Sequence, residues 1–355
     1  MVNFELISWN DDFELDGFGI VMIVKLLKQR IYIDISNTKT QEIKEVKELE
    51  QIPYDGIINK GKRILKENKI SKLRDEYTKK TIWYNQWEES MNERIESLGL
   101  NECYSIDIEM LLDKINENDK SGFKKYTILQ EVLLVPIYVD NNEIISTENT
   151  LEWSSKNISE ILGLNQEEGI NIIKSIDKFT KDITGYWSKC IRYGIFGLGI
   201  AALASIVFLP VIATSVGTAL GLSGGAAITG GLSAIAGGSL ATGGLGMLGG
   251  YAIVVGGGSM LGLVGGVGIA NKIGNIDEGY LLVSLVKILN SIEYLNRKKY
   301  KDIDGIKNRI LERFITLKHN LERDILINRN FNDYSKFEKK LELLNYTYDQ
   351  ICKNM

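Results

Sequence analysis

Histidine, cysteine and proline are scarce in this sequence, and the first two shortages exclude common kinds of site. The 355 residues include one histidine, three cysteines and three prolines. A zinc site or a disulfide framework needs several clustered cysteines or histidines. Cys103, Cys190 and Cys352 are far apart and form no C-x-x-C pair, which favours a reducing compartment. We therefore expect no metal and no cofactor.

Complete catalytic motifs are also missing. Gly221-Leu222-Ser223-Gly224-Gly225 fits the G-x-S-x-G pattern of a hydrolase nucleophile, but a working serine needs a preceding strand, a histidine and an acid. The single histidine, His319, lies about a hundred residues away in a charged helical pattern. No Walker loop, H-E-x-x-H motif or Rossmann glycine pattern occurs in its proper context. The sequence therefore does not predict an enzyme.

Charge is absent from one long stretch. From Tyr193 to Asn271, 79 consecutive residues carry no charged side chain and no histidine, although 25% of the chain is charged. A helix that crosses a bilayer needs about 20 apolar residues, so the stretch predicts a membrane segment. Basic residues flank both of its ends, which predicts an even number of spans, either two or four, and places both termini in the cytoplasm. The expected location is the bacterial inner (cell) membrane.

Glycines spaced four apart give this stretch a surface for close helix packing. It contains 23 of the 35 glycines in the chain, and small residues four apart let membrane helices approach closely. The pattern resembles glycine-zipper-type membrane proteins, which implies a glycine-rich hairpin and a homo-oligomer. The expected packing residues are Gly217, Gly221, Gly225, Gly246, Gly250, Gly258, Gly262 and Gly266, and the expected membrane-interface anchors are Tyr186, Trp187, Lys189, Arg192 and Lys272.

The rest of the chain divides into three regions. Residues 1–100 begin with short runs rich in Ile, Val and Phe, and these predict strands at Asn3–Ser8, Ile20–Val24 and Ile31–Ile35. A charged helical pattern follows from Lys44 to Leu98, broken at Gln51–Gly56. Residues 101–185 and 276–355 read as helical on either side of the uncharged segment 193–271. The predicted fold class is a mainly α membrane protein with a small N-terminal α/β part, a helical soluble domain, a glycine-rich transmembrane hairpin and a C-terminal helical bundle.

Two helical patterns carry more specific expectations. Trp83, Trp87 and Met91 fall four apart on one helix face, as core residues do. In the C-terminal region, apolar residues follow one another at near-heptad spacing. This spacing fits either a coiled coil between copies or a helix pair within one chain. These residues are Ile303, Ile306, Ile310, Phe314, Leu317 and Leu321.

The stretch from Leu129 to Ile173 resembles the TerB-like tellurite-resistance helical domains. The resemblance rests on an apolar helix, the turn Asp140–Ser146 and a helix start at Leu162-Gly163-Leu164-Asn165. It implies a metal-binding or signal-binding role for the acidic residues of the turn, here Asp140 and Glu143. Without the resemblance, Asp140 is an ordinary turn residue and Asn165 an ordinary helix N-cap.

Two functional hypotheses follow from these patterns. The first is a membrane effector whose cytosolic domain senses a signal and whose glycine-rich segment oligomerises to permeabilise the inner membrane, in antiviral defence or cell suicide. The second is a non-conducting membrane anchor or scaffold that recruits a protein partner. The expected partners are the lipid bilayer, further copies of the chain, and a cytosolic protein or small-molecule trigger. The net charge of −4 implies no general nucleic-acid binding.

Overall fold

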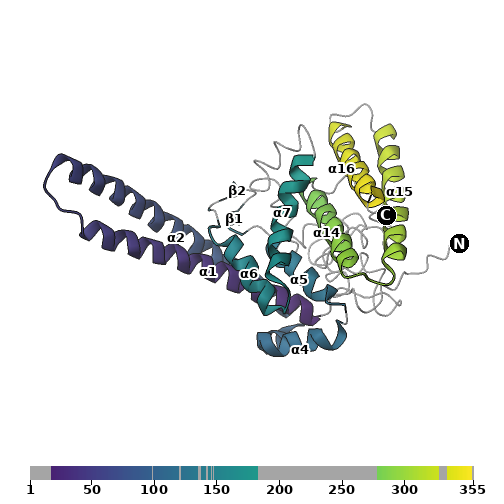
Figure 1. Cartoon of the computed structure of the whole chain (residues 1–355), viewed down its shortest axis with the longest axis horizontal. Helices are drawn as coiled ribbons and strands as arrows, with labels where there is room; N and C mark the ends of the chain where they lie inside the picture. The colour runs from purple at the N-terminus through teal and green to yellow at the C-terminus, as the bar shows by residue number, and fades with distance from the viewer. Residues whose placement is uncertain are drawn as a thin grey trace.

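The computed structural model describes residues 17–182, 278–327 and 334–353, except positions 98, 120, 135, 136, 141, 142, 145 and 147. These parts are mainly helical (Figure 1). The helices are α1 (Gly17–Glu50), α2 (Ile57–Ser97), α3 (Asn101–Ser105), α4 (Ile108–Asn118), α5 (Phe123–Leu134), α6 (Leu151–Ile161), α7 (Gln166–Asp182), α14 (Glu278–Arg297), α15 (Ile303–Ile327) and α16 (Tyr334–Lys353). The strands β1 (Val139–Asp140) and β2 (Glu143–Ile144) pair antiparallel.

Helices α1 and α2 form an antiparallel hairpin whose far end extends well beyond the helical body (Figure 1). We call the part of this hairpin between Ser36 and Tyr77 the arm. At 1.5 Å per residue, the 34 residues of α1 span about 50 Å. The break predicted at Gln51–Gly56 is confirmed, because α1 ends at Glu50 and α2 begins at Ile57. Gly56 has φ +92°, a backbone conformation that a residue with a side chain rarely adopts.

The first half of α1 runs through the core of the body. Its residues Ile20–Val24 are at most 1% exposed, and α2, α4 and α5 pack around this part of the chain. The prediction of strands at Ile20–Val24 and Ile31–Ile35 is wrong, since both runs belong to α1. A helix enclosed by several neighbours buries consecutive residues, so its sequence resembles a buried strand. The strand predicted at Asn3–Ser8 lies outside the described residues.

Aromatic side chains of α2 complete this core. Trp87 and Met91 are buried, and Trp83 packs against the same core, as their spacing predicts. Trp83 meets the ring of Tyr138 edge to face, with 5.4 Å between the ring centroids. This contact ties α2 to the segment that leads into β1.

Helix α14 packs against α5 and α7 through paired polar groups. Lys287 forms a buried ion pair with Glu131 of α5, with 2.7 Å between Nζ and Oε2. The rings of Tyr126 and Tyr294 stack with 4.0 Å between their centroids. Two further pairs join α7 to α14, namely Glu168 with Arg297 and Ser175 with Asn290. Because the numbers of these partners run in opposite directions, the two helices are antiparallel, and Asp182 and Glu278 lie at the same end of the pair.

The near-heptad residues of α15 serve a contact within the chain. Ile306, Ile310, Phe314 and Leu321 are buried, and α15 packs against α16, which contributes Leu343 and Leu344 among its own buried residues. Of the two readings that the spacing left open, the structure shows the intramolecular helix pair.

The prediction of a mainly α membrane protein with a transmembrane hairpin is corrected here. Within the ranges described above, no helix is both long enough and apolar enough to cross a membrane. The physical reason is charge: the long helices α1, α2 and α15 carry charged residues along their length, and α14 buries Lys287 near its middle. The membrane and transmembrane predictions came from residues 193–271, which lie outside the described part of the chain.

Replacing Phe314 tests the α15–α16 pair. The Phe314 side chain is 1% exposed, so Phe314→Ala should lower the free energy of unfolding by about 3–5 kcal/mol. The neighbouring Ile315 is 43% exposed, and Ile315→Ala is the matched control, with an expected loss below about 1 kcal/mol. Urea unfolding followed by circular dichroism measures both. Equal losses for the two variants would contradict the packing described here.

Candidate functional site

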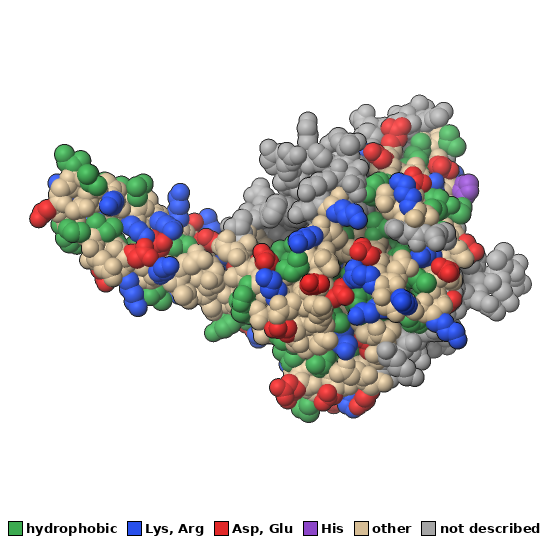
Figure 2. Space-filling view, viewed as in Figure 1, with side chains coloured by type: hydrophobic (Ala, Val, Ile, Leu, Met, Phe, Trp, Pro, Cys, Tyr) green, Lys and Arg blue, Asp and Glu red, His purple; other side chains and the backbone are tan. Residues whose placement is uncertain are grey.

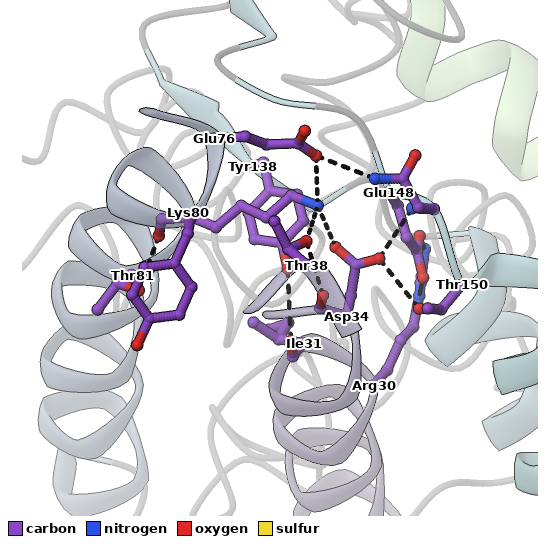
Figure 3. Close-up of polar contacts among 12 residues, drawn as sticks. Arg30, Ile31, Asp34, Thr38, Glu76, Lys80, Thr81, Tyr138, Glu148 and Thr150 are labelled. Carbon is purple, nitrogen blue, oxygen red and sulfur yellow. Dashed lines mark hydrogen bonds and ion pairs between the residues drawn. The ribbon is translucent and has the colours of Figure 1, made fainter. Parts of the chain in front are cut away.

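A cluster of charged and polar residues, most of them buried or half-buried, lies where the arm meets the body (Figure 3). We call it the basal cluster. Its members come from α1, from α2 and from the segment between β2 and α6. They are Arg30, Asp34, Thr38, Glu76, Lys80, Glu148, Asn149 and Thr150.

Asp34 is at the centre of the basal cluster and has no exposed surface. Its Oδ2 accepts a hydrogen bond from Nζ of Lys80 at 2.6 Å. Its Oδ1 accepts from the backbone N–H of Asn149 at 2.8 Å and from the hydroxyl of Thr150 at 3.1 Å. Both oxygens of one carboxylate therefore hold three segments of the chain together.

The ammonium group of Lys80 has three polar neighbours. Besides Asp34, its Nζ reaches Oγ1 of Thr38 at 3.0 Å and Oε1 of Glu76 at 2.8 Å. The Lys80 side chain is completely buried. With two hydrogen bonds to α1 and an ion pair within α2, Lys80 acts as a cross-link between α1 and α2.

Arg30 makes the second ion pair of the basal cluster. Its Nε donates to Oε1 of Glu148 at 2.9 Å, and Nη2 pairs with the other oxygen of the same carboxylate. Nη1 donates to the backbone carbonyl of Val132, close to the end of α5. A bidentate ion pair of this kind fixes the relative orientation of the two side chains as well as their distance. Arg30 therefore aligns α1 with α5 and with the segment before α6.

Tyr138 closes one side of the basal cluster in a strained conformation. It is fully buried with φ +63°, which is unusual for a bulky residue and costs about 1–3 kcal/mol. Its hydroxyl lies 3.4 Å from the carbonyl of Ile31, and Nζ of Lys80 lies 5.1 Å from its ring centroid. Burial, together with the negative charge of Asp34, raises the pKa of the Tyr138 hydroxyl far above its ordinary value. Tyr138 therefore stays protonated and serves packing.

Further along the arm, α1 and α2 are joined mainly by ion pairs. Glu42 pairs with Lys39 of its own helix and with Arg74 of α2, and Glu45 pairs with Lys66 and Lys69. These partners hold the pKa of both carboxyls below the usual 4.5, with Lys39 the largest influence on Glu42 and Lys66 the largest on Glu45.

The tip of the arm bears large apolar side chains that are mostly exposed to solvent. Figure 2 shows hydrophobic side chains gathered at the far end of the arm. Ile57 is 90% exposed, Ile58 76%, Tyr54 75%, Leu65 71% and Ile64 58%. We call these five residues the tip patch. The guanidinium of Arg63 lies 3.8 Å from the ring centroid of Tyr54 and donates to the carbonyls of Leu49 and Ile52. Arg63 therefore stabilises the turn between α1 and α2.

Most of the site residues predicted from the sequence lie outside the described part of the chain. All eight packing glycines and the five interface anchors, from Tyr186 to Lys272, lie outside the described residues. Asp140 and Glu143 face each other across the β1–β2 ladder. Among the described residues, no group of His, Cys, Asp or Glu has an arrangement that could hold a metal ion. Asn165 is the N-cap of α7, since its Oδ1 accepts from the N–H of Glu167 at 3.0 Å.

The basal cluster and the tip patch were both missed in the sequence. Arg30 and Asp34 stand four residues apart beside a strongly apolar run, and this is the one local sign that charges are buried there. Comparison with known protein families, with curated proteins and with solved structures finds no match.

Removing the Lys80 charge tests the basal cluster. In Lys80→Met, Asp34 stays buried without its counter-charge, so we expect a loss of about 3–5 kcal/mol in the free energy of unfolding. The matched control is Lys79→Met, because Lys79 pairs with Asp75 on the surface and should contribute below about 1 kcal/mol. The double variant Asp34→Leu/Lys80→Met should lose less than the sum of the two single variants. A loss in Lys80→Met no larger than in Lys79→Met would show that the buried ion pair between Asp34 and Lys80 does not stabilise the fold.

Acid should weaken the ion pairs of the arm. Glu42 and Glu45 have a pKa below 4.5 in the folded chain, so the stability they add is present above pH 4.5 and disappears as the pH falls through their lowered pKa values. Urea unfolding at several pH values between about 6 and 2 measures this loss. The variant Glu42→Gln/Glu45→Gln should show a shallower decline over the same range. An identical decline in both proteins would show that these carboxyls are not responsible.

Proposed function

We propose that this protein is a non-enzymatic scaffold that docks a protein partner on the tip of its α1–α2 arm. The observation that carries the proposal is the tip patch, where five large apolar side chains stand at least 58% exposed at the point farthest from the body. Contiguous exposed apolar surface on a soluble region is characteristic of interaction sites. Protein interfaces concentrate apolar and aromatic residues at their centre and polar residues around them.

The surroundings of the tip patch match that layout. Lys60, Lys62 and Glu67 are exposed around its apolar residues, and Tyr54 supplies an aromatic ring. A buried aromatic anchor ringed by polar residues is the usual energetic centre of a protein interface.

The construction of the arm also supports docking. Its base is fixed by the buried contacts of Asp34 and Lys80, and further along the arm the ion pairs of Glu42 and Glu45 join α1 to α2. A binding surface on a rigid support loses little conformational entropy when a partner binds. The arm can therefore present the tip patch at a constant distance and direction from the body.

The proposal retains the partner-recruiting part of the second sequence-based hypothesis. The effector hypothesis depended on residues 193–271, which lie outside the described part of the chain, and the described residues add nothing in its support. Docking at the tip requires only residues of the arm.

Site-specific photo-crosslinking tests docking in the native cells. A benzoylphenylalanine placed at position 58 lies in the tip patch, and one placed at position 82 replaces another exposed isoleucine of the same helix, 55% exposed. We expect a discrete cross-linked product from position 58 and none from position 82, and we expect Ile57→Glu/Ile64→Glu to abolish it. No product from position 58, or equal products from both positions, would contradict docking at the tip.

A further inference from the structure

Gly61 stands in the middle of the tip patch, and none of the described residues packs against it. It is an interior residue of α2, where glycine is less favourable than alanine. A Cβ atom at Gly61 would meet no atom of the described residues within 4 Å. By contrast, Gly169 of α7 is required by packing, because a Cβ there would lie 2.6 Å from the carbonyl oxygen of Ser155 in α6. Gly61 therefore leaves an open gap on the surface where a backbone from outside can approach closely.

The face that carries Gly61 points away from α1. Arg63 donates to the carbonyls of Leu49 and Ile52, and Lys66 pairs with Glu45, so these two residues mark the side of α2 that faces α1. At 100° per residue, they lie about 200° and about 140° around the helix from Gly61. The first helix of the arm therefore leaves the Gly61 face uncovered.

The four apolar helical residues of the tip patch are placed symmetrically about Gly61. Ile58 and Ile64 lie three residues before and after it, and Ile57 and Leu65 lie four residues before and after it. If a second α2 crosses antiparallel at Gly61, Ile58 of one copy is level with Ile64 of the other. Ile57 is likewise level with Leu65. The patch is thus complementary to itself, as an interface between identical chains with two-fold symmetry requires.

Charge does not exclude the antiparallel arrangement. Lys60 and Glu67 are exposed on one edge of the Gly61 face, seven residues apart. In the antiparallel pair this edge is shared, so the two Lys60 residues lie about 3 Å apart along the axis, and each lies about 7.5 Å from Glu67 of the other copy. A parallel pair would bring Lys60 of one copy equally close to Lys62 of the other, so these charges do not set the direction of the pair.

We infer that the partner docked on the arm is a second copy of this chain, bound antiparallel through α2 with Gly61 at the crossing point. The inference rests on the proposed docking function and names its partner. The two chains overlap only near their tips, since Ile57, the first residue of one α2, is level with Leu65, four positions beyond Gly61 in the other. Small stable interfaces bury about 1,200 Å² in total, so a five-residue patch on each copy fits a dimer that dissociates on dilution.

Filling the gap at Gly61 tests the contact. We expect sedimentation velocity of the full chain to show a monomer–dimer equilibrium that depends on concentration. Gly61→Leu should raise the dissociation constant at least about tenfold, because its side chain occupies the space of the second helix. The folded monomer should be retained, since leucine favours a helix. Ser71→Leu, also exposed on α2, is the matched control and should leave the constant unchanged. A monomer at all concentrations, or a dimer unaffected by Gly61→Leu, overturns the inference.

A distance measurement tests the direction of the pair. Spin labels are attached at Ile82→Cys in a chain carrying Cys103→Ser, Cys190→Ser and Cys352→Ser. Position 82 is 21 residues from Gly61, so the antiparallel dimer places the two labels about 63 Å apart, and a parallel dimer places them side by side. A pulsed electron resonance peak near that longer distance, lost in Gly61→Leu, is the expected result. A short distance overturns the antiparallel pair.

The cellular cross-link separates this inference from the proposed function. A product from position 58 with the mass of two chains supports both. A product that joins the chain to a different protein retains the scaffold and overturns the self-pairing. Failure to form any product from position 58 overturns both.

Discussion

The ion pair between Asp34 and Lys80 is the interaction on which the position of the arm depends. Both side chains are completely buried, and a buried charge is tolerated only when its partners are in place. Asp34 holds Asn149 and Thr150 with its second oxygen. The direction of the arm and the course of the segment before α6 are therefore fixed by the same carboxylate, and neither can shift without leaving a charge unpaired in the core.

Much of the helical layout could be predicted from the sequence, because its signals are local. The break at Gln51–Gly56 and the core face of Trp87 and Met91 follow from turn residues and from helical spacing. The basal cluster could not be predicted, since Lys80 and Thr150 are 46 and 116 residues from Asp34 along the chain. The tip patch could not be predicted either. Whether Ile57 or Ile64 is exposed depends on whether another element packs against it, and local sequence does not show this.

In the described parts of the molecule, the body and the arm are stabilised in different ways. The body buries a large apolar core around α1 and α5 and brings Asp182 and Glu278 to one end of the α7–α14 pair. The arm contains little apolar core between its helices and is held mainly by ion pairs. Five of its large apolar residues are exposed at the tip, where they contribute little to the core of one chain. The exposure of these apolar residues is explained if the tip binds another chain.

Hydrogen exchange along the arm, measured at low and at high protein concentration, tests this account most directly. The account predicts slow exchange of the amides around Asp34 and Lys80 at both concentrations, because the buried ion pair keeps the base closed. It also predicts that amides from Ile57 to Asn68 exchange more slowly at high concentration, while those of α15 do not change. Rapid exchange at the base, or a tip whose exchange is the same at both concentrations, would contradict it.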